Sequence, residues 1–498
     1  MRASGSATPE APTRFRLRSP PPDPPEAPIP TTSPLPLLSL LAAVACSSPV
    51  ALPPRATAIA ARGDQPDLLL FLAPGLRADF PGTPGAEAAF TAPLAERLDA
   101  RFSAAYSASP ARWVGLGTLL TGRYPAAVPV CGLPSTGPRA AHGAPWCTSI
   151  PAEVPTLPEV LTLYGYQTAL FTFHLAGQSL ITGRFGGAHD LDPTWELPTT
   201  PWDTLAQSLS AWWAAHTESP RLAVVVVSDL MYSERQDLRQ DLALDGWTGE
   251  TPDGWAHTAG LHERAMARYQ ADAGAMGQHL ADLLTTLDGG PRPMLALAGA
   301  TNGMSLGELE GKVSQRDFFF SNSLVLERTV HVPLLMLGAP GAGVPAEVPR
   351  LVQLVDVLPT LSALAGAMPP ANLAGESLLL EGHGDVAYAE LGDMIAMRQG
   401  RLMLTFRLPR HNTCSLDPQF QAALQAPDHL SRLHVHDVVD DPLQLSAMEP
   451  GHGISPSDLG ALYQDLLALR EGPAAPAPGA LSKEHIHEIH LTAAQGYW

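Results

Sequence analysis

Residues 105–125 read AYSASPARWVGLGTLLTGRYP, and the rest of the chain is interpreted from this stretch. The run from Trp113 to Leu120 is largely apolar, which is typical of the start of a helix that packs against a sheet. Ser107 and Ser109 lie just before it, but a serine is a poor nucleophile until a base or a metal activates it. The stretch alone therefore predicts a buried helix and assigns no chemistry to it.

The last part of the stretch, LLTGRYP, resembles the end of the active-site signature of sulfatases, in the alkaline phosphatase superfamily. In that family a Cys or Ser, any residue, Pro, any residue and Arg lie just upstream, and the nucleophile is matured to formylglycine and held on a metal. Aligned without a gap, the nucleophile position is Arg112, the Pro position is Val114 and the Arg position is Leu116. A gapped alignment, with residues 110–112 as the Pro-x-Arg piece, puts Ala108 at the nucleophile position. Neither alignment supplies a Cys or a Ser there.

The resemblance extends to the two loops that hold the metal in this family. Residues 67–73, DLLLFLA, form a nearly continuous apolar run, as expected of a strand buried on both faces. The family places its metal-binding aspartates directly after this strand, where this chain has Pro74 and Gly75. After a later strand the family has an Asp-His pair, which is Thr301-Asn302 here. The family would use calcium or magnesium, but these residues lack the charge of a hard-metal site, so no metal or other cofactor is predicted.

Other signature positions are replaced as well. Residues 165–171, GYQTALF, resemble the second sulfatase signature, Gly-Tyr-x-Thr leading to Gly-Lys-x-His. Its sulfate-binding lysine falls at Phe173 and its histidine at Leu175, one residue beyond His174. A one-residue shift that used His174 would turn its side chain to the other face of a strand. Ser321 stands where many relatives place a further Lys or His. The resemblance thus implies a sulfatase frame whose charged groups have been replaced.

This resemblance implies an α/β fold with a large mixed, mainly parallel sheet flanked by helices, followed by a small carboxyl-terminal antiparallel sheet with a helix. Buried strands are expected at residues 222–227, 294–298 and 332–337, and an antiparallel meander at 386–391, 394–398 and 402–407. The expected divisions are an amino-terminal segment and linker (1–65), the α/β domain (66–380), the antiparallel subdomain (381–472) and a tail (473–498).

Helix ends are marked by short signals. Thr156-Leu157-Pro158-Glu159 is a capping box that starts a helix, and Gly165 is expected to end it. A long amphipathic helix is expected at residues 262–287, stopped by Asp288-Gly289-Gly290. Asp356 is the expected N-cap of a further helix that Gly366 ends. A final helix is expected at 456–470.

Composition restricts the partners. The chain has 498 residues, of which 45% are hydrophobic, enough for a large buried core. Its 30 basic and 49 acidic residues give a net charge of −19. Such a charge argues against binding of nucleic acid and against strong electrostatic capture of polyanionic glycans.

The amino-terminal segment predicts export. Residues 1–34 are rich in Pro, Ser and Ala and cannot bury a core. Residues 37–48, LLSLLAAVACSS, are too short to span a bilayer and fit the core of a signal peptide. Cys46 after Val44-Ala45 resembles the lipidated cysteine of bacterial lipoproteins, which implies a periplasmic or envelope lipoprotein with a lipid anchor. The alternative is a misassigned start codon ahead of an ordinary signal peptide.

Three more cysteines remain after Cys46. Cys131 and Cys147 could close a short loop in an oxidising compartment, which would leave Cys414 over. Sequence alone does not fix this pairing.

Two functions compete. The leading hypothesis is a catalytically inactive sulfatase-fold protein, a pseudosulfatase of the bacterial envelope, which binds or scaffolds a small anion or a protein partner. Arg112 stands at the family's nucleophile position, and its guanidinium suits the binding of sulfate or carboxylate. The alternative is an active sulfuric or phosphoric ester hydrolase with a relocated site that uses Asp229 or His174.

Overall fold

The computed structural model describes residues 65–79, 85–128, 150–172, 181–191, 199–230, 261–306, 325–338, 344–380, 385–391, 394–407, 433–442, 444, 447–448 and 456–471. Within these ranges, no helix combines the length and the apolar character needed to cross a membrane.

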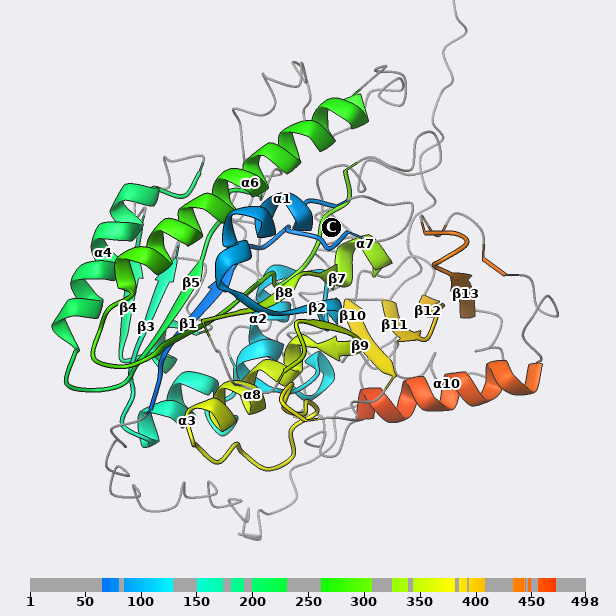
Figure 1. Ribbon diagram of the computed structural model, residues 1–498. Helices are drawn as coiled ribbons and strands as arrows, with labels where there is room; N and C mark the ends of the chain where they lie inside the picture. The colour runs from blue at the N-terminus through cyan, green and yellow to red at the C-terminus, as the bar shows by residue number, and fades with distance from the viewer. Residues whose placement is uncertain are drawn as a thin grey trace, which may run out of the picture. The chain divides into compact units, whose positions relative to one another are not determined.

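The described residues form a nine-stranded mixed sheet in the main domain (Figure 1). Its strands are β1 (Asp67–Leu72), β2 (Leu98–Tyr106), β3 (Gln167–Thr172), β4 (Gly187–Asp190), β5 (Arg221–Val226), β6 (Met294–Gly299), β7 (His331–Val332), β8 (Leu334–Leu337) and β9 (Glu347–Gln353). Neighbours follow the order β4-β3-β5-β1-β6-β8-β2-β7, and β9 pairs with β2. The first five strands in this order pair in parallel, whereas β8 runs antiparallel to β6 and β2. The expected mixed sheet is confirmed.

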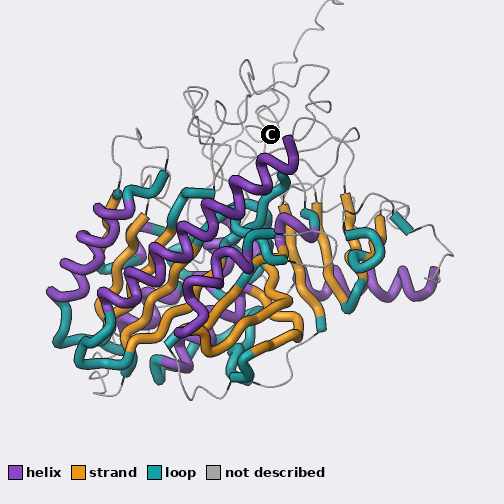
Figure 2. Tube along the Cα trace, turned by 45° about the horizontal axis from the view of Figure 1, so that its top comes forward, coloured by secondary structure: helices purple, strands orange, loops and turns teal. Residues whose placement is uncertain are grey.

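Strand β1 lies in the interior of this sheet, between β5 and β6. All of its residues are buried, and Figure 2 shows helices on both sides of the sheet. A strand that is covered on both faces has no solvent side on which to place polar residues. This is why the apolar run in the sequence is nearly continuous, as predicted.

Helices cover the two faces of the sheet in two groups (Figure 1). One group is α1 (Glu87–Thr91), α4 (Trp202–Ala215) and α6 (Leu261–Leu287), and the other is α2 (Arg112–Thr121), α3 (Leu157–Leu163) and α8 (Val357–Leu364). Helix α6 confirms the predicted long amphipathic helix, and the apolar residues along one of its faces are buried. These are Ala265, Met266, Tyr269, Ala273, Met276, Leu280, Leu283 and Leu284.

The ends of α3 follow the sequence signals. The backbone N–H of Thr156 donates to Glu159 Oε2 at 2.9 Å, which is one half of the predicted capping box. At the other end Gly165 has φ +90°, and the Tyr166 N–H donates to the Leu161 carbonyl at 3.2 Å. Glycine adopts this left-handed conformation without strain, so the helix ends where the sequence predicts.

Asp356 is the N-cap of α8, as expected, but its side chain makes no capping hydrogen bond to that helix. A 3₁₀ turn, Leu354–Asp356, runs directly into α8, so the helical run begins earlier than the sequence indicates. Asp356 Oδ2 therefore accepts a hydrogen bond from the backbone of Gln353 at 2.8 Å, and Oδ1 accepts one from Glu376 at 2.8 Å. Gly366 has φ +65° and ends α8 as predicted.

A small four-stranded antiparallel sheet confirms the predicted meander and extends it by one strand. It runs in the order β10 (Val386–Leu391), β11 (Met394–Gln399), β12 (Leu402–Arg407) and β13 (Leu433–Asp437). Helix α10 (Pro456–Glu471) follows and packs Tyr463 and Leu466 into the same apolar cluster as Tyr388 and Phe406. The Glu390 N–H donates to the Ala108 carbonyl at 2.9 Å, which ties this sheet to the loop after β2.

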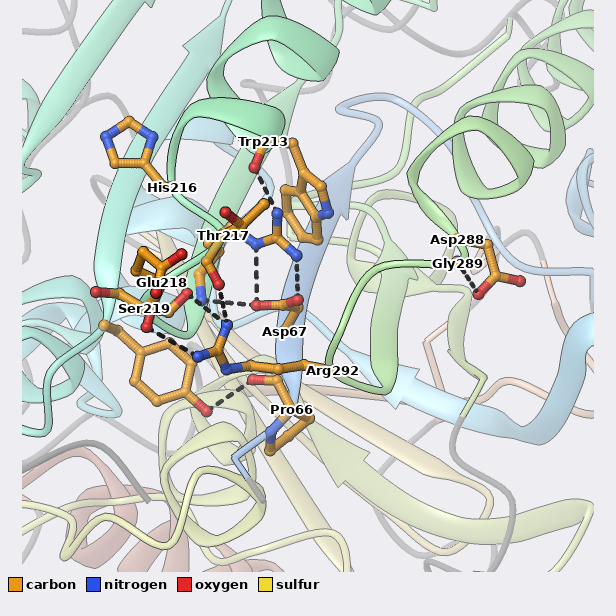
Figure 3. Close-up of polar contacts among 12 residues, drawn as sticks. Pro66, Asp67, Trp213, His216, Thr217, Glu218, Ser219, Asp288, Gly289 and Arg292 are labelled. Carbon is orange, nitrogen blue, oxygen red and sulfur yellow. Dashed lines mark hydrogen bonds and ion pairs between the residues drawn. The ribbon is translucent and has the colours of Figure 1, made fainter. Parts of the chain in front are cut away.

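A buried ion pair lies at the amino-terminal ends of β1 and β5 (Figure 3). Asp67 and Arg221 are each 1% exposed. Asp67 Oδ1 accepts hydrogen bonds from the backbone N–H and the Nε of Arg221, both at 3.0 Å, and Oδ2 accepts one from Nη2. Arg221 Nη1 donates to the Trp213 carbonyl, and the guanidinium lies 4.3 Å from the centre of the Trp213 ring. The pair joins two neighbouring strands at the edge of the sheet where both strands begin.

Candidate functional site

Four loops meet at one edge of the main sheet. Strands β1, β2, β5 and β6 run in the same direction, so the segments that follow them emerge at the same edge. These segments contain residues 73–76, 107–111, 227–230 and 300–303. In open α/β sheets ligands bind outside the carboxyl ends of the strands. This edge is therefore the candidate site, which we call the carboxyl edge.

Thr301 and Asn302 follow β6 and are both 0% exposed. Thr301 Oγ1 donates a hydrogen bond to Asn302 Oδ1 at 2.9 Å, and Asn302 Nδ2 donates to the Gly303 carbonyl at 2.8 Å. Both side chains are neutral and already paired. The oxygens that remain at these two positions are therefore engaged inside the protein.

Pro74 and Gly75 follow β1, and the main chain fills the space beside Gly75. Its N–H donates to the Asn302 carbonyl at 2.9 Å. Gly75 has φ +90°, and a Cβ added there would lie 2.8 Å from the Leu230 carbonyl oxygen. A side chain at this position would need both a strained backbone and a shift of the loop after β5. Gly75 thus contributes a close backbone approach and no ligand.

Ser107 follows β2, and its hydroxyl is enclosed by backbone atoms. Its oxygen lies 2.5 Å from the Thr301 carbonyl oxygen and 2.7 Å from that of Ser109, so its single proton is shared between them. The Ser109 N–H donates to the same hydroxyl at 3.2 Å. Ser107 is 0% exposed. All of its hydrogen-bond partners among the described residues are backbone atoms, so this part of the structure provides no base to make the hydroxyl a nucleophile.

Arg112 is the first residue of α2, and its guanidinium lies 4.7 Å from the centre of the Trp113 ring. The ungapped alignment therefore places the nucleophile position at the start of a helix. Leu116 is buried in the main core, at 1% exposed. Ala108, the position from the gapped alignment, is 0% exposed and packs in the cluster formed by the small sheet and α10.

Asp229 is the carboxylate that follows β5. Its Oδ1 accepts a hydrogen bond from Trp202 Nε1, at the start of α4, at 3.0 Å. Asp229 is 9% exposed. The structure thus places it at the carboxyl edge, as the relocated-site alternative requires.

Several predicted positions lie outside the described residues. These are Cys46, Cys131, Cys147, Phe173, His174, Leu175, Ser321 and Cys414.

The donors at the carboxyl edge do not fit a hard divalent cation. Calcium and magnesium sites are built from carboxylate and other oxygens that converge on the ion. Pro74 and Gly75 offer no side-chain oxygen, and those of Thr301 and Asn302 are hydrogen-bonded to each other. In the described ranges, no group of three or more His, Cys, Asp or Glu residues is arranged to hold a metal ion.

A buried polar cluster beside the carboxyl edge escaped sequence analysis. Tyr106, the last residue of β2, donates to Glu327 Oε1 at 2.5 Å, and Arg398 Nε lies 3.4 Å from Glu327 Oε2. The His331 ring stacks on Tyr106 with a centroid distance of 4.9 Å. Burial and the nearby Glu327 carboxylate hold the pKa of the Tyr106 hydroxyl well above its ordinary value. Glu327 begins α7 (Glu327–Val330), and Arg398 comes from β11, so the cluster joins the two sheets.

Comparison with solved structures identifies the fold. A 2-O GAG sulfatase superposes with a TM-score of 0.55 and 17% identity, over 81% of this chain and 91% of that one. The phosphonate monoester hydrolase of Agrobacterium radiobacter superposes with a TM-score of 0.55 and 15% identity, over 82% and 95% of the two chains. The chain has the sulfatase fold. The predicted fold class is confirmed, with its small antiparallel sheet included.

Sequence comparison supports the same family over a short stretch. Arylsulfatase K of Mus musculus is 44% identical over 69 residues, which are 14% of this chain and 12% of that protein. Arylsulfatase K of Homo sapiens is 41% identical over 69 residues, or 14% and 13%. No protein-family model matches the chain. The similarity thus spans well under two thirds of the relatives' length, and the resemblance to sulfatases is confirmed at the level of the fold.

Proposed function

We propose that this sulfatase-fold protein is catalytically inactive and acts by binding. The observation that carries the proposal is the state of the carboxyl edge, where Thr301 and Asn302 pair with each other and Gly75 is closed by main chain. A sulfatase mechanism needs a nucleophile and groups that neutralise the developing charge. Losing one electrostatic stabiliser typically costs on the order of 10²–10³ in rate. Losing several together leaves no route to turnover.

Turnover assays on the purified chain test this proposal. The substrates are an aryl sulfate ester and an aryl phosphonate monoester, each with millimolar calcium or magnesium. We expect no release of the phenol above the buffer rate, because no activated nucleophile is present at Arg112 or Ser107.

The alternative of an active hydrolase rests on Asp229, the carboxylate at the carboxyl edge. If turnover is observed, Asp229→Asn decides the matter, with Asp203→Asn on the exposed side of α4 as the matched control. Activity lost in the first variant and kept in the second would replace our proposal with a relocated ester hydrolase.

The ligand that we propose is a small anion held by Arg112. An arginine in the first turn of α2 adds positive charge at the positive end of the helix dipole, which a bound anion relieves. The planar guanidinium also matches the oxygens of sulfate or carboxylate. A protein partner that presents such a group would be recognised by the same chemistry.

Titration calorimetry with sulfate measures this binding. Arg112→Ala should weaken it at least about tenfold, because a hydrogen bond to a charged group contributes about 1.5–3 kcal/mol. The matched control is Arg123→Ala, because Arg123 lies two residues beyond Thr121, at the opposite end of the same helix. Equal loss in both variants, or no sulfate binding in the unmodified chain, would rule out a specific site at Arg112.

We place the protein in the bacterial envelope, exported and anchored through Cys46. The support is the apolar run that precedes this cysteine. Fractionation of cells that express the full chain, compared with Cys46→Ser, checks this placement, and an unchanged soluble distribution of both would refute the anchor.

A further inference from the structure

We propose that direct hydrogen bonds between neutral groups hold the carboxyl edge together, so that the fold is independent of divalent cations. We call this set the neutral joint, and it consists of Gly75, Ser107, Thr301, Asn302 and Gly303. The proposal goes beyond catalytic inactivity, because an inactive protein could still require a bound cation for its stability. The neutral joint lies where the resemblance to sulfatases would imply a bound cation.

The neutral joint connects three loops without a charged group. The Gly75 N–H donates to the Asn302 carbonyl at 2.9 Å, which links the loops after β1 and β6. The Ser107 hydroxyl, 2.5 Å from the Thr301 carbonyl oxygen, links the loops after β2 and β6. The side chains of Thr301 and Asn302 complete the set through their mutual bond and the bond to Gly303.

Helix α7 closes the neutral joint from a further side. The Gly303 N–H donates to the Thr329 carbonyl at 2.9 Å, and the Ser107 N–H donates to the Val330 carbonyl at 2.8 Å. Buried polar groups are costly unless they are paired, and here the donors find acceptors within the loop after β6, in the neighbouring loops or in α7. The loops are thus joined to one another directly.

The physical contrast with a cation site lies in the charge. Carboxylates gathered at one place repel each other unless an ion neutralises them, which makes such a fold depend on its metal. Neutral groups that donate hydrogen bonds to one another do not repel each other, so they need no ion to hold them together. A cation that entered the joint would have to break the bond between Thr301 and Asn302 and lose its own water, and the joint's residues would offer it no negative charge in return.

Thermal unfolding with and without a chelator is the first test. We expect the midpoint of the purified full chain to agree within about 1 °C in EDTA and in millimolar calcium or magnesium. A ligand that binds only the folded state would raise the midpoint with its concentration. A rise of several degrees with either ion, or metal that copurifies at stoichiometry, would overturn the proposal.

A serine variant tests the hydrogen bonds themselves. Ser107→Ala removes the only hydroxyl in the joint that spans two loops, and should lower the midpoint by about 2–5 °C with or without metal. Ser362→Ala in α8 is the matched control, since its buried hydroxyl has no hydrogen-bond partner among the described residues. We expect it to shift the midpoint by less than about 1 °C. Equal shifts of the unfolding midpoint in the two variants would show that the hydrogen bonds of Ser107 do not stabilise the carboxyl edge.

An asparagine variant tests the preference for neutral groups. Asn302→Asp places a carboxylate against the Gly303 carbonyl in a fully buried position, and should lower the midpoint by several degrees. Added calcium should not restore it, whereas the exposed control Asn372→Asp should behave like the unmodified chain. Restoration by calcium would show a latent cation site and would contradict the proposal.

These outcomes are separable from those of the proposed function. If stability depended on metal and no turnover were seen, the proposal that the fold is independent of divalent cations would be refuted, while catalytic inactivity would stand. Turnover in the absence of metal would contradict catalytic inactivity and leave the neutral joint unaffected.

Discussion

Replacing Asp67 with alanine is expected to lower the free energy of unfolding by about 3–5 kcal/mol. The change leaves the Arg221 guanidinium at 1% exposure without its carboxylate. An unpaired charge in the interior loses its hydration without the compensating attraction of a partner, which is why breaking a buried pair costs far more than the pair itself contributes.

The surroundings of the pair make this loss hard to absorb. Asp67 accepts hydrogen bonds from the backbone N–H of Arg221 as well as from its side chain, so the substitution also removes a tie between β1 and β5. The Arg221 guanidinium is paired with Asp67, donates to the Trp213 carbonyl of α4 and lies 4.3 Å from the centre of the Trp213 ring. Arg221 cannot turn to solvent without displacing that helix.

Chemical denaturation followed by tryptophan fluorescence measures the effect. Asp288→Ala is the matched control, because Asp288 pairs with Arg97 at an exposed site, with side chains 56% and 31% exposed. Exposed pairs contribute about 0–1 kcal/mol. The double variant Asp67→Leu with Arg221→Met should recover part of the loss, since apolar replacements of a buried pair are often neutral. A single variant no worse than the control would show that the pair is not needed.

Gly115→Ala is expected to destabilise the protein by about 1–3 kcal/mol or more, although alanine is the better helix former. A Cβ at this position in α2 would lie 2.3 Å from the Thr301 carbonyl oxygen and 3.0 Å from Ser107 Oγ. The closest atom belongs to the backbone, so relief requires α2 or the turn after β6 to move. Either movement opens the neutral joint.

The control for Gly115 is a glycine in a helix with room beside it. At Gly274 in α6 the nearest atom to an added Cβ is the Ala89 carbonyl oxygen at 3.7 Å, which is ordinary contact. Gly274→Ala should therefore stabilise the protein by about 0.5–1 kcal/mol. Opposite signs for the two substitutions, measured by the same denaturation experiment, support the close approach of α2. The same sign for both would contradict it.

Much of the fold could be predicted because its signals are local. The apolar run of β1 and the stripe along α6 reveal which faces are buried. The turn between β11 and β12 contains Gly400, which has φ +55° and shows in the sequence as a Gln-Gly pair. The resemblance to sulfatases supplied the order in which these elements assemble.

Other features could not be predicted because their partners are far apart in the chain. Asp67 and Arg221 are separated by 154 positions, and Ser107 and Thr301 by 194. Strand β2 carries Asp99 and Arg101 within an otherwise mixed pattern, because Arg101 pairs with Glu87 and Glu347, which lie elsewhere in the sequence. No periodicity marks such pairs, so the way the carboxyl edge is closed became visible only in the structure.

The left-handed glycine at position 75 also limits which side chains can stand there. An aspartate there would have to reverse the hand of its backbone and push away the Leu230 carbonyl, 2.8 Å from the added carbon. We therefore expect Gly75→Asp to harm folding before the new carboxylate could serve as a ligand. The backbone at position 75 therefore admits a metal-binding side chain only if the loops around it are rebuilt together.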